Sequence, residues 1–144
     1  MSEVDEFLAA MLPTIHEMDR AFINGDAGPR REIWSHDDPV TLFGALLTER
    51  GWDEVGPAFD FLASRFSNGT RYDYEVIGAG ASGDLAYIVG NEHTMASVGG
   101  ATPEAIDLRV TTILRRENGE WRIVHRHAGP IPGADATRRQ ITRF

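Results

Sequence analysis

Apolar residues recur every three or four positions in two stretches of the chain, a spacing typical of amphipathic helices. The first stretch covers residues 4–22 and predicts a long helix, with Ser2 and Asp5 in the positions of a capping box. The second covers residues 52–66, and Asn68-Gly69 is expected to end it. Two long helices are therefore predicted in the first half of the chain.

The segment between these helices predicts a short helix and a small hairpin. Asp26 is expected to be the N-cap of a helix that runs to about Trp34, and the Asp-Pro pair at 38–39 ends it, because a residue before proline avoids the helical region. Residues 40–43 then predict a short strand, and residues 46–48 its return partner.

From Thr70 onward the hydrophobic period changes to two, which is the period of a half-buried strand. One strand is predicted from Thr70 to the turn at 82–84, and three more at 85–98, 104–116 and 121–128, the last two joined by a tight turn at Asn118-Gly119. Helices followed by an antiparallel meander predict an α+β fold. Its helices would pack on one face of a strongly curved antiparallel sheet that encloses a pocket. Residues 1–129 are expected to form this single domain, and residues 130–144 a polar tail.

Composition excludes several classes of function. The 144 residues carry 22 acidic and 14 basic side chains, for a net charge of −8, so neither nucleic acid nor a membrane surface is an expected partner. There is no cysteine, which excludes disulfides and thiol catalysis. No phosphate-cradling glycine loop of recognised spacing is present, so no cofactor is predicted. A cytoplasmic location is expected, because no secretion signal or membrane-spanning run is found.

The last predicted strand carries the most informative polar residues. Strict alternation places Ile123, His125 and His127 on one face, which would begin in the core and end at a pocket unless a bulge breaks the count. His127 is the predicted acid or base, and His125 a predicted ligand contact. The alternative is one buried structural histidine and one surface histidine.

A second group of candidate catalytic residues lies where the short helix meets the first strand: His36, Asp37 and Asp38. An aspartate near a histidine can orient the imidazole, although aspartates also simply end helices and start turns. A metal held by the two strand histidines with His93, Glu92 or Asp37 was weighed, but no recognised ligand spacing is present, so no metal is predicted.

Arg109 is the predicted anchor for an anionic group of the ligand, with a structural ion pair as the alternative. Glu92 and His93 face opposite sides of their strand, so one of the two is expected to reach the cavity, and His93 is a further candidate ligand contact. The arginines of the last hairpin are expected on a solvated or dimer-facing surface: Arg115, Arg116, Arg122 and Arg126. Aromatic residues expected to line the pocket, or alternatively to form plain core, are Trp34, Phe43, Trp52, Phe59 and Tyr74.

Two segments of this chain, 34–44 and 108–127, resemble SnoaL-like proteins, which are related to nuclear transport factor 2 and ketosteroid isomerase. The resemblance runs from the first helix to His127. It implies a cone formed by a bent sheet and covering helices, with a pocket inside, but no particular reaction, because the family holds isomerases, cyclases, dehydratases, epoxide hydrolases and association domains. Met18 and Phe43-Gly44 fall near the positions of the steroid isomerases' tyrosine and base, which argues against that reaction.

Two functions are consistent with these patterns. The first is an acid–base isomerase, cyclase or hydratase that acts on a largely apolar compound bearing a carbonyl or carboxylate. The alternative is a non-catalytic ligand-binding or association module. A homodimer is expected in either case, because one face of the sheet is left uncovered.

Overall fold

The computed structural model describes residues 1–44 and 47–131. In this part of the chain, helices and strands follow one another as α1 (Glu3–Phe22), α2 (Gly28–Ile33), β1 (Thr41–Phe43), β2 (Thr48–Arg50), α3 (Trp52–Arg65), β3 (Phe66–Ser82), β4 (Leu85–Val98), β5 (Glu104–Glu117) and β6 (Glu120–Pro130). The predicted tail lies mostly outside the described residues.

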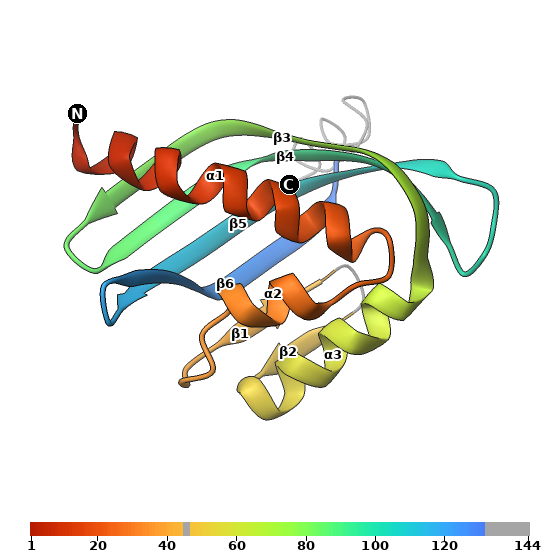
Figure 1. Cartoon of the computed structure of the whole chain (residues 1–144), viewed down its shortest axis with the longest axis horizontal. Helices are drawn as coiled ribbons and strands as arrows, with labels where there is room; N and C mark the ends of the chain where they lie inside the picture. The colour runs from red at the N-terminus through yellow and green to blue at the C-terminus, as the bar shows by residue number, and fades with distance from the viewer. Residues whose placement is uncertain (45–46, 132–144) are drawn as a thin grey trace, which may run out of the picture.

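The strands form one curved, unclosed sheet in the order β2-β1-β6-β5-β4-β3. The β1–β6 pair is parallel and the other neighbouring pairs are antiparallel. Figure 1 shows α1 lying across the sheet, with α2 and α3 beside β1 and β2, so that helices cover one face. The cone-shaped α+β fold expected from the sequence is confirmed.

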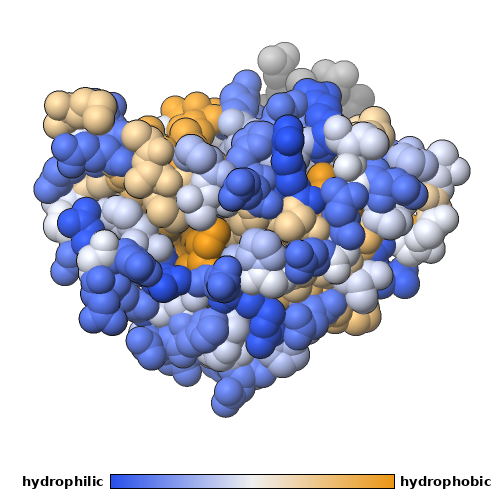
Figure 2. All heavy atoms as spheres, viewed as in Figure 1, coloured by the Kyte–Doolittle hydropathy of each residue, from blue (hydrophilic) through white to orange (hydrophobic). Residues whose placement is uncertain are grey.

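The first helix forms as predicted. Ser2 and Asp5 make the capping box, and Pro13 is accommodated inside the helix. Its buried side chains, among them Phe7, Ile15 and Phe22, pack into the main core with the apolar residues of the sheet's inner face. On the helix-bearing side seen in Figure 2, hydrophilic residues dominate, with small hydrophobic areas along the edge of α1. No helix in the described part of the chain is long and apolar enough to cross a membrane.

Two helix boundaries differ from the prediction. The N-cap of α2 is Ala27, whereas the carboxylate of Asp26 accepts the Gly28 N–H at 2.9 Å just before the helix. The Asn68-Gly69 pair does not end α3. That helix ends at Arg65, and β3 begins at once. Asn68, with a φ of 51°, lies instead at a register shift between β3 and β4.

The small hairpin is displaced along the sequence. Its first strand begins at Thr41, and its return strand covers Thr48–Arg50. The prediction placed this return strand at 46–48, and residues 45–46 lie outside the described part of the chain.

A bulge in β6 overturns the predicted face of the last strand. Ile113 pairs with His125 whereas Leu114 pairs with Ile123, so Val124 is an extra residue. Ile123 and Val124 are both buried, at 2% and 9% exposure. The alternation therefore changes phase, and His125 lies on the face opposite to Ile123. The expectation that one face runs from Ile123 into the histidines was wrong, because it assumed strict alternation.

Candidate functional site

Five polar side chains from five different elements meet between the helices and the inner face of the sheet. Asp19 comes from α1, Arg30 from α2, Tyr72 from β3, Glu92 from β4 and Arg126 from β6. We call these five residues the interior polar cluster. The first four are at most 5% exposed, and the Arg126 side chain is 12% exposed. Charged residues are rarely buried this completely unless they are paired.

Arg126 and Glu92 form a two-pronged ion pair across the sheet. The Nη1 and Nη2 atoms of Arg126 donate to Oε2 and Oε1 of Glu92, each at 2.8 Å. The Tyr72 hydroxyl also donates to Oε2 of Glu92 at 2.8 Å. Glu92 is therefore held by three hydrogen bonds from two neighbours, and its position is fixed.

Asp19 and Arg30 form the second buried pair, which joins α1 to α2. The Arg30 guanidinium donates through Nη2 to Oδ1 of Asp19, and it lies 3.5 Å from the centre of the Phe22 ring. Burial raises the pKa of Asp19, and the charges of both Glu92 and Arg126 also act on that pKa, so the two ion pairs form one cluster.

The pKa values of the two carboxylates, Glu92 and Asp19, are shifted in opposite directions. Burial alone would raise the pKa of Glu92, but Arg126 and the Tyr72 hydroxyl hold it below the usual range. Burial raises the pKa of Asp19; Arg30 opposes this increase and the charge of Glu92 adds to it. When the pKa values of two neighbouring carboxyl groups are shifted in opposite directions, one group can stay a fixed anion while the other carries a proton.

Four buried polar atoms have no hydrogen-bond partner among residues 1–44 and 47–131: Oδ2 of Asp19, Nε of Arg30, Nε1 of Trp34 and the hydroxyl of Tyr74. Asp19 and Arg30 belong to the cluster, and Tyr74 stands one inward-facing position along β3 from Tyr72. Burial raises the pKa of Tyr74 to about 12, so its hydroxyl is protonated at neutral pH. Unpaired buried polar atoms are costly, and two of the four belong to the interior polar cluster, where a water or ligand oxygen would give them partners.

Gly90 makes room for Tyr74 on the inner face of the sheet. A Cβ built on Gly90 would lie 2.8 Å from the Tyr74 ring and 2.1 Å from the Glu75 carbonyl oxygen. Any larger residue at position 90 would displace Tyr74.

The predicted anchor Arg109 and the predicted acid–base residue His127 lie together on the outer face of the sheet. Both line a hollow of about 400 Å³, with Ile77, Asn91 and Thr111 among its other residues. The structure thus brings Arg109 and His127 together on the side of the sheet opposite the interior polar cluster. Their assignment as anchor and acid or base stays a prediction.

His125 and His93 also lie on the outer face. The Nδ1 atom of His125 is 2.7 Å from the Thr41 hydroxyl, and burial lowers the pKa of this histidine. His93 pairs with Asp107 at 2.7 Å. The exposed ring of Phe43 packs edge-on against both His125 and His127, at 5.3 and 5.6 Å between ring centres.

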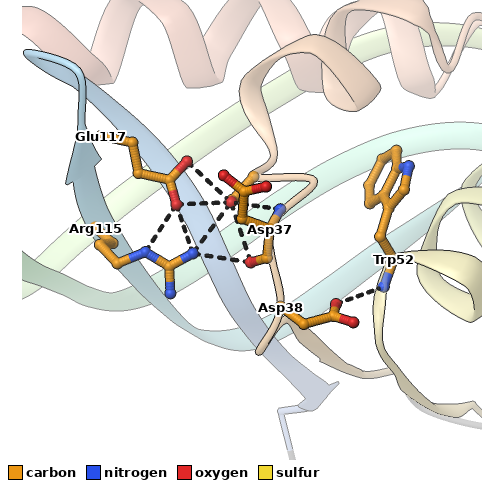
Figure 3. A network of polar contacts seen from close by, with 6 residues as sticks. Asp37, Asp38, Trp52, Arg115 and Glu117 are labelled. Carbon is orange, nitrogen blue, oxygen red and sulfur yellow. Dashed lines mark hydrogen bonds and ion pairs between the residues drawn. The ribbon is translucent and has the colours of Figure 1, made fainter.

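His36, Asp37 and Asp38 lie in the connection between α2 and β1, where Figure 3 shows the two aspartates. Asp38 accepts the backbone N–H of Trp52 at 2.9 Å at the start of α3. The His36 ring stacks on Trp52 with 3.9 Å between ring centres. These contacts hold the segment between α2 and β1 against the start of α3.

A network around Ser35 anchors the same connection to the last hairpin. Arg115 donates to the Asp37 carbonyl oxygen at 2.9 Å and to Glu117 at 2.5 Å. The buried Ser35 hydroxyl donates to Glu117 at 2.8 Å and accepts the Asp37 N–H at 3.1 Å. The Asp37 backbone is therefore held through its carbonyl oxygen by Arg115, as Figure 3 shows, and through its N–H by Ser35.

The predicted lining residues separate into core and surface. Trp34 and Phe59 are 1% and 0% exposed and pack edge-to-face in the main core. Tyr74 faces the interior, Trp52 is half-buried beneath His36, and Phe43 is 39% exposed.

Four of the five cluster residues were not predicted as site residues, and Glu92 was expected only as an alternative to His93 in the cavity or as a metal ligand. Arg126 was expected on the surface, and the structure buries it because of the bulge in β6. Glu92 could have been found from its strand, since the inward positions around it are apolar or small. Asp19 stands on the buried stripe of α1 beside Met18, a signal that the sequence did contain. Among the described residues, no group of three or more metal-ligating side chains is found.

The curved sheet and its covering helices have the fold of nuclear transport factor 2-like proteins. The SnoaL-like domain model matches residues 12–132. The chain belongs to the SnoaL-like family. No curated protein matches it.

Solved structures of low sequence identity share the fold. A candidate dehydratase of the nuclear transport factor 2-like family from Streptomyces avermitilis is 16% identical, with 90% of this chain and 99% of that chain covered and a TM-score of 0.72. A candidate calcium/calmodulin-dependent kinase II association domain from Thiobacillus denitrificans is 21% identical, with 83% and 93% covered and a TM-score of 0.68. A candidate ketosteroid isomerase from Parabacteroides distasonis is 16% identical, with 81% and 84% covered and a TM-score of 0.62.

Proposed function

We propose that this protein is an acid–base enzyme that isomerises, cyclises or hydrates a small, largely apolar molecule at the interior polar cluster. The observation that carries the proposal is a set of buried polar atoms that have no partner in residues 1–44 and 47–131, together with two buried ion pairs next to the apolar core. Similarity to a candidate dehydratase and a candidate ketosteroid isomerase is consistent with this class of reaction.

Each cluster residue has a distinct role in the proposal. Asp19 exchanges the proton with the substrate, because its pKa is raised and its Oδ2 atom has no partner in the described part of the chain. Glu92 stays ionised and holds Arg126 and Tyr72 in place. The Tyr74 hydroxyl donates to the substrate oxygen.

Turnover of a panel of enolisable ketones, epoxides and hydroxy compounds tests the proposal. We expect Asp19→Asn to lose about 10²-fold or more of the wild-type rate on any accepted substrate, since that is the usual contribution of a positioned acid or base. Asp84→Asn, in the exposed turn between β3 and β4, removes one carboxylate elsewhere and should keep full activity. A folded Asp19→Asn protein with undiminished turnover would contradict the role of Asp19.

We propose in addition that the protein is a homodimer, which is also the arrangement that a non-catalytic association module would use. The outer face of the sheet carries large apolar side chains that are exposed to solvent: Ile77 at 67%, Leu85 at 58%, Tyr87 at 48% and Ile113 at 37%. Several exposed apolar residues on one uncovered sheet favour a second copy as the covering partner.

Sedimentation velocity tests the dimer. Ile77→Asp should shift the protein to monomer, because it places a charge in the proposed apolar interface. Phe61→Asp is the matched control, since Phe61 is 60% exposed on α3. A monomeric wild-type protein at micromolar concentration would contradict the dimer and leave the interior site untouched.

A further inference from the structure

The charges of the interior polar cluster balance one another. The buried charged residues in residues 1–44 and 47–131 are Asp19, Arg30 and Glu92, and the Arg126 side chain joins them at 12% exposure. Each carboxylate contacts one guanidinium. Because a guanidinium keeps its proton in proteins, the two pairs together carry no net charge when both carboxylates are ionised.

Each guanidinium of the cluster already holds a carboxylate of the protein. Both Nη atoms of Arg126 donate to Glu92, so its fork is not open to a second carboxylate. Nη2 of Arg30 donates to Asp19, and its Nε is a single donor. A ligand carboxylate would therefore enter as an uncompensated buried charge, which is strongly unfavourable.

The unpaired atoms match a neutral oxygen function instead. Nε of Arg30 and the Tyr74 hydroxyl can each donate one hydrogen bond, and Oδ2 of Asp19 can accept one. A hydroxyl or carboxamide group can satisfy such a set without bringing a charge, and a carbonyl oxygen can accept from its two donors.

We propose that the interior polar cluster selects uncharged ligands that carry a carbonyl, hydroxyl or carboxamide oxygen and rejects the corresponding carboxylates. This inference rests on the proposed function and narrows its substrate class. It also predicts that the selectivity depends on the net charge of the cluster. Glu92→Gln removes one negative charge and leaves one guanidinium unbalanced, so the preference should turn toward carboxylates.

Binding of isosteric amide and carboxylate pairs tests the proposal. The pairs are benzamide and benzoate, 2-naphthamide and 2-naphthoate, and cyclohexanecarboxamide and cyclohexanecarboxylate, titrated by calorimetry at neutral pH. In the wild-type protein we expect at least one amide to bind about tenfold or more tightly than its carboxylate, a difference of about 1.4 kcal/mol. In Glu92→Gln the order should reverse for the same pair, whereas Asp84→Asn should behave as wild type.

Two further variants keep the test informative. Asp19→Asn removes the other buried carboxylate and should reverse the order in the same way if Glu92→Gln does not fold. Tyr74→Phe removes a hydroxyl that has no partner among the described residues, so it should weaken amide binding several-fold without loss of stability.

Each other outcome counts against a definite statement. A carboxylate that binds the wild-type protein as tightly as its amide, or an order unchanged in both charge variants, overturns the charge selectivity and leaves the interior site standing. Amide binding unchanged in Tyr74→Phe places the ligand elsewhere and also overturns the proposal. If no pair binds the folded wild-type protein or either charge variant, the interior ligand site itself is overturned.

Discussion

Glu92 and His93 are consecutive residues of β4, and they show how different the two faces of the sheet are. Glu92 points inward and pairs with Arg126 at 2.8 Å; His93 points outward and pairs with Asp107 at 2.7 Å. The side chains of the inner pair are 12% and 4% exposed, and those of the outer pair 31% and 48%. Two polar side-chain pairs of nearly equal length thus lie in very different surroundings.

The distance between two polar atoms alone therefore does not say how much their contact stabilises the fold. Water and salt screen the outer pair, which belongs to a class worth about 0–1 kcal/mol. If one partner of the inner pair is lost, the other stays buried without water or a counter-charge. Removing a single member therefore costs the fold far more stability than keeping the pair. Burying such a cluster destabilises the fold. Its position beside polar atoms that have no partner in the described residues is most simply explained by function.

The largest expected effect comes from breaking the inner pair. Arg126→Met leaves the Glu92 carboxylate buried without its partner and should lower the free energy of unfolding by about 3–5 kcal/mol in urea denaturation. The double variant Glu92→Leu/Arg126→Met should recover most of this loss, because no charge is left unpaired. Asp107→Ala, which breaks the outer pair, should cost about 1 kcal/mol or less. Equal losses for the inner and outer single variants would remove the distinction between the faces.

The pH dependence of stability separates the two inner carboxylates. The folded-state pKa of Glu92 lies below its ordinary value of 4.5, so its stabilising contribution is present above pH 4.5 and is lost as the pH falls through the folded pKa. The wild-type advantage over Glu92→Gln should therefore shrink in acid.

For Asp19 the sign is reversed, because the folded pKa lies above the ordinary value of 3.8. Its favourable contribution is present below pH 3.8 and is lost as the pH rises through the folded pKa. The wild-type protein should lose ground to Asp19→Asn as the pH increases. Urea unfolding of both variants over a pH series measures this, with Asp84→Asn as the control for a lost surface carboxylate. If the unfolding free energies of the two variants changed with pH in parallel, the opposite pKa shifts of Glu92 and Asp19 would be contradicted.

A smaller effect is expected at Asp38, outside the interior. Asp38→Ala removes the acceptor of the Trp52 N–H at the start of α3 and should cost about 1 kcal/mol, as the loss of a helix cap does. Turnover and ligand affinity should be unchanged once the protein is folded. Thermal unfolding and the panel assay check the two halves of this prediction, and a large loss of activity in the folded variant would restore Asp38 as a catalytic candidate.

The fold was largely predictable from the sequence, because each of its long elements has a clear period. The alternating residues of β4 and β5 gave both strands within one residue of their observed ends. The site was predicted less well, for one local reason. A single extra residue, Val124, exchanges the faces of the following residues, so that Arg126 enters the core and His127 leaves it.

Other features depended on contacts that no local pattern contains. The role of Asp38 as an acceptor for α3 joins residues 14 positions apart. The pairing of Asp19 with Arg30 depends on how α2 packs against α1. A polar residue on an otherwise apolar stripe was visible at Asp19, and such residues are the best sequence signal of a buried polar cluster.

The central claim is that the inner face, and not the outer face, holds the functional site. The most direct measurement compares the dissociation constant of the best-bound amide in the wild type, Asp19→Asn and His127→Gln. We expect Asp19→Asn to change the dissociation constant by about tenfold or more and His127→Gln to leave it within about twofold of wild type. Loss of binding in His127→Gln with wild-type affinity in Asp19→Asn would place the site on the outer face and contradict the account.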